Sequence, residues 1–451
     1  MNEGVPVMYA GYGGPGLYMV GGGRLEAPED ASPAPATPRR SARRAHSDHT
    51  AFGYEESDDD SSLSSNTSSS NKSNEKVGEC SQVERVGPGS PAAGAGGYTR
   101  EWRGRRHQRT RRYPPDRYLN ATYPFQVKFA PEDLLNGSKW DTLSQEIWDK
   151  FVKSQQTEET FRKKMNLWKY LYVSIKSIFP RYGLYVVGST MSGFGLESSD
   201  MDLCLFVRPV DNIDNIDPRA HALFHLNYIL GYIKGFDPGA EVIQAKVPIL
   251  KFRDARAGVQ VDLNCNNVVG IRNTNLLNCF SKLDWRVRPL VAVAKLWARA
   301  HHINDARHRT ISSYALTLMV IHYLQCGVSP AVLPRGAEAG GAEWWRAGTC
   351  RLSLGELFCG LLRYYAMFPY GHAAVSVRAG ARLPLAACRA HAQEPHHWRL
   401  LCVEEPFNLS NTARSVYDPE TFERIVTAFR DSYKRLAGSL RLHDAWPVTD
   451  R

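Results

Sequence analysis

The segments Val186-Val187-Gly188-Ser189 and Ser199-Asp200-Met201-Asp202-Leu203 decide the fold. The first is the end of an apolar strand, and Gly188, which has no side chain, allows the backbone to approach a ligand closely. Ser189 then offers a hydroxyl group and a backbone N–H at a predicted helix start, which favours a bound phosphate group. Together the two segments predict a strand, a phosphate-binding turn and a second strand.

Three aspartates are the candidate catalytic residues. Asp200 and Asp202 are two residues apart on a strand, so their side chains point to one face. Adjacent carboxylates repel each other, and divalent cations, which oxygen ligands hold well, best explain the pair. Asp262, in the apolar strand Val259–Leu263, would complete a two-metal site. Such a site stabilises the attacking and leaving oxygens of an in-line displacement, and we expect Asp262 to help deprotonate an attacking 3′-hydroxyl.

The flanking sequence alternates between strand-like and helical patterns. Helical periodicity covers residues 140–178 and Phe224–Ile233, and strands are expected at Leu184–Val187, Met201–Val207, Val242–Phe252 and Val259–Leu263. After Pro289, helices are expected at Leu290–His301, Ser312–Gln325, Ser353–Phe368 and Thr421–Leu440. We expect an inserted loop at residues 327–348 and an irregular segment at residues 371–399. The fold class expected from this pattern is therefore α/β (α+β), with a mainly helical second part.

Composition separates an N-terminal region from the globular part. Residues 1–117 are of low complexity and carry few large apolar side chains, so we expect this region to be disordered. The chain has 56 Lys+Arg against 46 Asp+Glu, a net charge of +10, which suits a polyanionic partner. The arginine-dense segment Arg100–Arg112 fits contacts with RNA phosphates and bases, and it also fits a solvated basic linker.

The sequence argues against several classes of protein. No apolar run reaches the roughly 18 residues of a membrane span, and no secretory leader is expected. The nine cysteines form no Cys-x-x-Cys pair, so we expect reduced thiols in an intracellular protein. Four histidines lack partners at ligand spacing and are expected to be surface or packing residues: His301, His302, His396 and His397.

Further motifs follow the aspartates along the chain: Val247-Pro248-Ile249-Leu250-Lys251-Phe252, Asp262-Leu263-Asn264-Cys265-Asn266-Asn267, Asn273-Thr274, Lys295-Leu296-Trp297-Ala298, Ser312-Ser313-Tyr314 and Val403-Glu404-Glu405-Pro406-Phe407. On these motifs, the chain from about Tyr118 onward resembles the DNA polymerase β-like nucleotidyltransferase superfamily. Within it, the sequence is most similar to the terminal nucleotidyltransferases, and in particular to the germline-type cytoplasmic poly(A) RNA polymerases.

The resemblance implies two domains after the N-terminal region. Residues 118–288 would form the nucleotidyltransferase catalytic domain with its mixed sheet, and residues 289–451 a mainly helical central, or poly(A)-polymerase-associated, domain. The nucleotide would lie in the cleft between them. Residues just before the catalytic half are expected to pack onto the central half.

The resemblance also implies a set of nucleotide-binding residues: Gly188, Ser189, Asn273, Thr274, Lys295, Arg299, Ser313, Tyr314 and Asn411. Ser189, Ser313 and the cations would contact the triphosphate, Asn273 and Thr274 the ribose, and Tyr314 the base. Lys295 and Arg299 lie four residues apart, so they share one side of a helix. By chemistry alone, a solvated helix face for Lys295 and Arg299 and core packing for Tyr314 remain open.

Base choice is expected to depend on Asn411. Related uridylyl-adding enzymes tend to carry a histidine at this place, where it crowds a purine, so Asn411 favours ATP. Asn408 stands where the family often has an acid. A loop with capping asparagines is the alternative reading of this segment.

The resemblance implies template-independent addition of AMP from ATP to the 3′-hydroxyl of RNA, as in extension of mRNA poly(A) tails, with two Mg²⁺ or Mn²⁺ ions. Such enzymes are cytoplasmic and usually depend on a separate RNA-binding protein, and we find no RNA-recognition motif, zinc knuckle or KH pattern. A terminal uridylyltransferase on the same scaffold is the alternative. An inactive RNA-regulator scaffold and a small-molecule adenylyltransferase fit the intact aspartates and the helical part less well.

Overall fold

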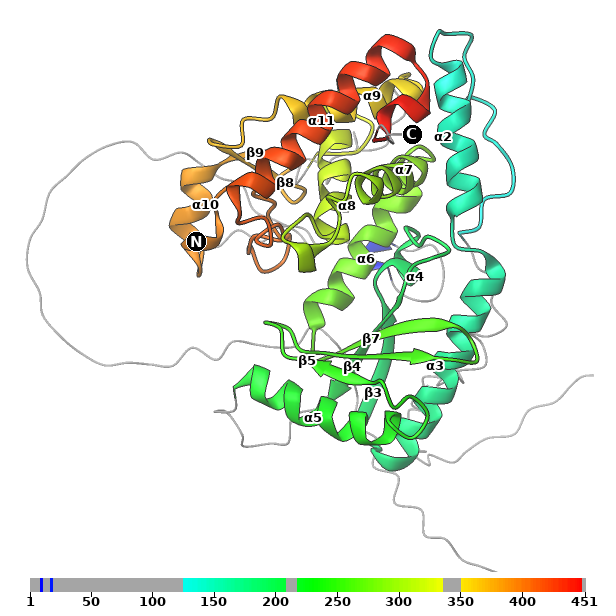
Figure 1. The fold of residues 1–451 in the computed structure, drawn as a ribbon, viewed down its shortest axis with the longest axis vertical. Helices are drawn as coiled ribbons and strands as arrows, with labels where there is room; N and C mark the ends of the chain where they lie inside the picture. The colour runs from blue at the N-terminus through cyan, green and yellow to red at the C-terminus, as the bar shows by residue number, and fades with distance from the viewer. Residues whose placement is uncertain (1–8, 11–16, 19–124, 208–216, 336–349, 448–451) are drawn as a thin grey trace, which may run out of the picture. The chain divides into compact units, whose positions relative to one another are not determined.

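A five-stranded mixed sheet carries the two segments that decide the fold (Figure 1). The computed structural model describes residues 9–10, 17–18, 125–207, 217–335 and 350–447. The strand order is β3-β4-β7-β6-β5, with β4 and β7 parallel and the other neighbours antiparallel. The strands are β3 (Tyr182–Val187), β4 (Met201–Val207), β5 (Glu241–Ile243), β6 (Ile249–Asp254) and β7 (Val259–Cys265).

The sheet confirms three of the four expected strands. The expectation of one strand at Val242–Phe252 is wrong, because β5 and β6 are separate strands that pair antiparallel. The chain reverses direction through residues 244–248, and Pro248 has no N–H to donate to a strand ladder. β5 and β6 therefore form a hairpin, and the pairing of β6 with β7 brings Lys251 opposite Asp262.

Two helices, α3 (Glu158–Ile178) and α5 (Pro218–Ile233), share a hydrophobic core with the sheet. Thr157 begins α3 by accepting a hydrogen bond from the Thr160 N–H. Asp217 caps α5 in the same way, just before Pro218, whose fixed φ suits the first helical position. These caps explain why both helices begin where they do.

β7 has the period of two that a half-buried strand requires. Its buried side chains are Val259, Val261, Leu263 and Cys265. The intervening Gln260, Asp262 and Asn264 are only partly buried. One face of β7 therefore belongs to the core, and the other face is free to carry polar chemistry.

The second half of the described chain consists of packed helices with a core of their own: α7 (Val287–Ala300), α8 (Ser313–His322), α9 (Leu354–Ala366) and α11 (Pro419–Ser439). α2 (Asp141–Ser154) precedes the sheet in sequence, but its buried residues Leu143, Ile147 and Phe151 belong to this helical core. Figure 1 shows these helices on one side of α6 and the sheet with α5 on the other. α2 lies within the range 118–288 that is predicted for the catalytic domain, although its core is that of the helical half. The residues just before this range lie outside the described residues, and the division at residue 288 stays a prediction.

α6 (Val268–Leu283) connects the two halves and has no counterpart in the sequence-based expectation. Its fully buried positions include Thr274 and Ser281 beside Leu277 and Phe280, so it lacks a continuous apolar stripe. Asn267 begins the helix, and its side chain accepts a hydrogen bond from the Gly270 N–H.

Residues 371–399 are a further correction, because they are not irregular throughout. They form β8 (Ala373–Ser376), β9 (Ala381–Pro384) and α10 (Leu385–His391). All four residues of β8 are buried, so this strand shows no alternation by which a sequence pattern could identify it. The C-terminal part of the expected loop at 327–348 lies outside the described residues.

Two short strands, β1 (Tyr9–Ala10) and β2 (Leu17–Tyr18), pair antiparallel. The rest of the region expected to be disordered, with the segment Arg100–Arg112, lies outside the described residues. Among the residues that the structure describes, no helix is both long and apolar enough to cross a membrane.

Candidate active site

The sheet register brings the candidate catalytic aspartates together. Asp202 on β4 lies directly opposite Asp262 on the parallel strand β7, and Asp200 immediately precedes β4. Lys251 on β6 completes the row, with its Nζ 3.1 Å from Asp262 Oδ1 and 3.8 Å from Asp200 Oδ2. Burial, and then the charges of Asp262 and Asp200, raise the pKa of Asp202 to about 7. Three carboxylates in this arrangement favour a bound cation.

The donor set of this row fits a hard divalent cation. Carboxylate oxygens are the ligands that Mg²⁺ and Mn²⁺ prefer. The pKa of Asp202 is raised first by burial and then by the charges of Asp262 and Asp200, which a cation would neutralise. In the described part of the chain, no group of three or more His, Cys, Asp or Glu side chains is already gathered around one point as a metal site. Lys251 draws Asp262 and Asp200 toward its ammonium instead. Metal binding by the three aspartates therefore stays a prediction.

Gly188 is required by the packing of the phosphate-binding turn. Its φ is +71°, and a Cβ added there would lie 2.1 Å from Asp202 Oδ2. Its N–H donates to Thr274 Oγ1 at 2.9 Å, and that hydroxyl donates in turn to Gly270 O at 2.7 Å. Thr274 therefore fixes the turn from α6, and the short helix α4 (Ser189–Ser192) begins directly after Gly188.

A cavity of about 450 Å³ joins the sheet to the helical half. All but one of the residues expected at the site line it: Gly188, Ser189, Asp200, Asp202, Asp262, Asn273, Thr274, Lys295, Arg299, Ser313 and Tyr314. Asn411 is the exception. The structure thus brings residues of β4, β7, α4, α6, α7 and α8 around one space.

Lys295 and Arg299 supply the positive side of this cavity from α7. Lys295 is buried, and its Nζ donates to Phe194 O at 3.0 Å. Burial, and then the charge of Arg299, lower the pKa of Lys295 to about 8, while Asp202 opposes the shift. Arg299 Nη1 lies 3.4 Å from Ser198 Oγ. A solvated helix face is therefore wrong for Lys295.

Three buried polar atoms in the cavity have no hydrogen-bond partner among the described residues: Ser192 Oγ, Asn264 Oδ1 and Asn273 Oδ1. Buried polar atoms in native proteins are nearly always paired, so such atoms need an explanation. All three lie beside the aspartate row and the phosphate-binding turn. Their position suits hydrogen bonds to a polar ligand such as a nucleotide.

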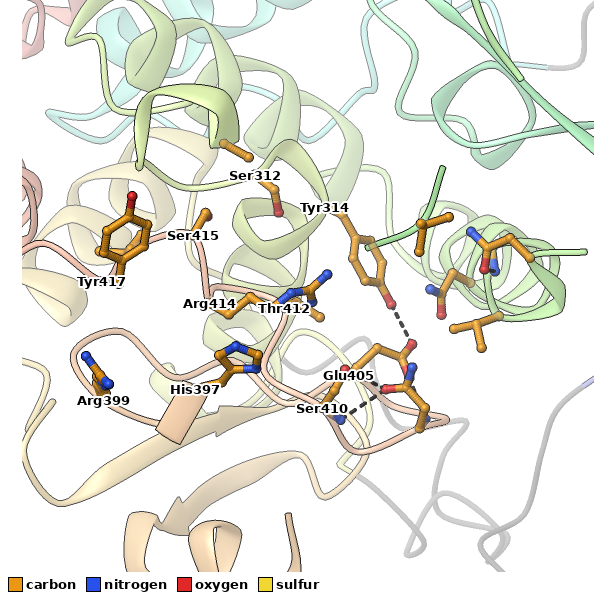
Figure 2. Close-up of a pocket in the computed structure, with 18 of the residues that line it drawn as sticks. Ser312, Tyr314, His397, Arg399, Glu405, Ser410, Thr412, Arg414, Ser415 and Tyr417 are labelled. Atoms are coloured by element: carbon orange, nitrogen blue, oxygen red, sulfur yellow. Dashed lines mark hydrogen bonds between the residues drawn. The ribbon is translucent and has the colours of Figure 1, made fainter. Parts of the chain in front are cut away.

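A second cavity of about 700 Å³ adjoins the first and shares Asn267, Gly270, Asn273 and Tyr314 with it (Figure 2). The Tyr314 hydroxyl donates to Glu405 Oε1 at 3.2 Å. Burial, followed by Glu405, raises the pKa of Tyr314. Glu405 Oε2 accepts from the N–H groups of Phe407 and Asn408. Tyr314 therefore stands as a fixed ring at the junction of the two cavities.

The expectation that Asn411 contacts the base is corrected by its hydrogen bonds. Asn411 is buried and lines neither cavity. Its Oδ1 accepts from the N–H groups of Val403 and Ala413, and its Nδ2 donates to the carbonyls of His397 and Leu401. The side-chain amide is fully used by the backbone, so Asn411 positions the loop rather than touching a ligand.

Lys164 is a functional candidate that sequence reasoning missed. It is buried on α3, and its Nζ donates to Gln156 Oε1 and Ser199 O, both at 2.8 Å, and to Thr190 Oγ1 at 3.4 Å. Burial lowers its pKa to about 8, although Asp202, Glu197 and Asp200 oppose that shift. The available signal is its position on the apolar stripe of α3, between Phe161 and Trp168.

The aspartates lie on paired strands, the turn that begins at Gly188 lies beside them, and the helical half completes the cavity. This arrangement defines a nucleotidyltransferase fold of the polymerase type. Residues 143–282 match the model of a family described as poly(A) RNA polymerase, mitochondrial-like, central palm domain, and residues 353–411 match that of the Cid1 family poly A polymerases. The chain is 36% identical to human poly(A) RNA polymerase GLD2 over 74% of this chain and 73% of that protein. The chain belongs to this family of poly(A) RNA polymerases.

Two further likenesses support the assignment. The chain is 43% identical to poly(A) RNA polymerase gld-2 homolog A of Drosophila melanogaster, over 73% of this chain and 26% of that protein. The chain therefore spans about a quarter of the length of that relative. A solved structure of a GLD-2/RNP-8 complex is 38% identical, with a TM-score of 0.59 over 68% of this chain and 98% of that one.

We predict that Lys164→Met lowers kcat by about 10²-fold while the protein remains folded, because the Ser199 carbonyl beside Asp200 loses its donor. Lys163→Met is the matched control, since Lys163 is the exposed neighbour on the same helix. Steady-state kinetics with thermal melting would measure both effects. If Lys164→Met folded and kept the wild-type kcat, the role of the Lys164 ammonium would be limited to balancing charge in the folded protein.

We predict that Asp202→Asn abolishes activity but raises the free energy of unfolding by about 1–3 kcal/mol at pH 8 without divalent ions, because a buried carboxylate beside two others costs stability. Millimolar Mg²⁺ should stabilise the wild type more than this variant. Denaturant titration with and without Mg²⁺ tests both points, with the exposed Asp149→Asn as control. A less stable Asp202→Asn protein would contradict the account.

Proposed function

We propose that this chain adds AMP from ATP to the 3′-hydroxyl of RNA without a template. The observation that carries the proposal is that one cavity joins three aspartates on the sheet to Lys295 and Arg299 on α7. Negative groups on one side suit cations and an attacking hydroxyl, and positive groups on the other suit a triphosphate. Both sets of groups line the one space in which an in-line displacement would bring its reactants together.

Different residues of this cavity would act on different steps of the nucleotidyl transfer. The 3′-hydroxyl attacks the α-phosphorus of ATP, the bond to the β-phosphate breaks, and pyrophosphate leaves. Asp262 would accept the hydroxyl proton, and Lys295 and Arg299 would offset the charge of the leaving pyrophosphate. Mg²⁺ or Mn²⁺ held by Asp200, Asp202 and Asp262 would activate the attacking oxygen and neutralise the phosphates.

Nucleotide recognition follows from the two adjoining cavities. Ser189 and Ser313 offer hydroxyls to the triphosphate, and Asn273, with its unpaired Oδ1, offers an acceptor to the ribose. Tyr314 presents its ring to the base, and Glu405 lies beside it. Thr274 acts on the ribose site indirectly, by holding the turn at Gly188.

ATP is the proposed nucleotide because the relatives with high identity are named poly(A) RNA polymerases. A structure of the Cid1 poly(U) polymerase is 26% identical to this chain. GLD-2 has been solved with RNP-8 and with GLD-3, which supports a separate protein partner that selects the mRNA target of this chain. We place the reaction in the cytoplasm by the same analogy.

Incubation of the full chain with a defined RNA and each NTP in turn tests the proposal. We expect long tails with ATP and Mg²⁺ or Mn²⁺, and none from Asp200→Ala. Long uridine tails with only traces of adenosine tails would instead support a terminal uridylyltransferase. Equal inactivity of the wild type and Asp262→Ala, even with a candidate partner, would support an inactive scaffold.

We predict that Asn411→Ala raises the KM for ATP by about tenfold and narrows the preference for ATP over UTP, because four backbone groups of the base-site loop lose their partners. Asn227→Ala is a matched control, since Asn227 is exposed on α5 and bonds a backbone carbonyl of its own helix. Steady-state kinetics with both nucleotides would measure the change. If Asn411→Ala left the KM for ATP and the preference for ATP over UTP unchanged, this loop would have no part in base choice.

A further inference from the structure

The larger cavity extends well beyond the site that we assign to the incoming base. Tyr314 and Glu405, the base-site residues, occupy only one end of it. Figure 2 shows Tyr417 and Arg399 at the other end, with Thr412 and Arg414 between them and Tyr314. The outer end therefore offers space beyond that of the incoming nucleotide.

The outer end is cationic. Arg399 is exposed, donates a hydrogen bond to His396 O at 2.8 Å and, within the described ranges, forms no ion pair. Arg414 donates to Asn411 O at 3.3 Å and is likewise without an ion pair in that part of the chain. The acidic residue among the described lining residues is Glu405, whose carboxylate already accepts three hydrogen bonds. An anionic occupant is favoured over a cationic one.

Tyr417 supplies a flat surface at this end. Its side chain is 51% exposed although it lines the cavity, and the Arg309 guanidinium lies 5.4 Å from the centre of its ring. The backbone beneath it is held firmly, because Ser415 Oγ donates to Thr310 O at 2.7 Å and Val416 is buried. Asp418, the next residue, caps α11 and directs its carboxylate to Thr421. An exposed, fixed aromatic ring among arginines is typical of a site where nucleic-acid bases stack.

We propose that the outer end binds the RNA nucleotides that precede the 3′-terminal one. Tyr417 stacks on a base, and Arg399 and Arg414 contact phosphates. The inference rests on the proposed function, because a growing strand must present its 3′-hydroxyl at the aspartates while its preceding nucleotides leave along the cavity. A chain of bases and phosphates matches both the aromatic ring and the cations of this end.

Binding of a fluorescently labelled oligoadenylate of about ten nucleotides to the full chain tests the proposal without catalysis. We expect Tyr417→Leu to weaken binding about five- to tenfold, in the range that loss of one stacked base produces. Arg399→Gln should weaken binding and lower the slope of log affinity against log salt by about one. In extension assays, both variants should raise the KM for the long RNA and leave the KM for ATP unchanged. A mononucleoside acceptor, which has no preceding nucleotide, should be used equally by the variants and the wild type.

Matched controls are Tyr228→Leu, which removes an equally exposed tyrosine from α5, and Arg181→Gln, which removes an exposed arginine before β3. Loss of RNA affinity no greater than in these controls would overturn the proposal. A raised KM for ATP with unchanged RNA affinity in Tyr417→Leu or Arg399→Gln would also overturn it, because the outer end would then bind the incoming nucleotide. If the wild type failed to extend RNA with any of the four NTPs, the proposed function would fail. The binding measurements would still decide whether RNA occupies this end.

Discussion

The parallel pairing of β4 with β7 is the constraint around which the rest of the structure is arranged. It holds Asp202 opposite Asp262, with Asp200 at the strand entrance. Burial, and then the charges of Asp262 and Asp200, raise the pKa of Asp202, because neighbouring like charges repel more strongly where water is removed. Three ammonium groups oppose that repulsion, and each comes from a different element: Lys164 on α3, Lys251 on β6 and Lys295 on α7.

This charge balance explains why the sheet and the helical half cannot be treated as independent. α7 reaches the loop between α4 and β4 twice, since Lys295 donates to Phe194 O and Arg288 donates to Gly193 O. That loop leads directly into the aspartate strand. The cation expected to face the triphosphate is therefore also a support for the carboxylates. A shift of the helical half would change both sides of the reaction together.

Much of the site follows from the sequence because it depends on simple periods. The alternation of β7 places Asp262 on the face away from the core, and the spacing of two does the same for Asp200 and Asp202. Other features depend on tertiary contacts that a pattern does not contain. α6 carries three asparagines and Thr274, and Asn273 and Thr274 line the cavity, so its apolar stripe is too weak to predict a helix. Lys164 interrupts the stripe of α3, and only its contacts with Ser199 and Gln156 explain it.

Asn411 illustrates why residue identity alone does not determine a role. An amide in this loop has the chemistry to read a base, and the same chemistry to satisfy backbone groups. The fold decides between them, because the Glu404–Asn411 bridge closes the loop and turns the amide toward Val403 and Ala413. The loop is in turn attached to β8, since the Glu404 N–H donates to Val375 O and the Glu404 carboxylate accepts from Arg378 and Ser376.

The position of Glu405 beside Tyr314 thus depends on β8, which shows no alternation in sequence, and on Asn411, which lines neither of the two cavities. Both act by fixing the backbone at the base site. Selectivity between bases of different size requires such fixed geometry, because a loop free to move would accommodate either base. We therefore expect base choice in this chain to depend on the loop and its attachment to β8 more than on any single side chain at the edge of the base.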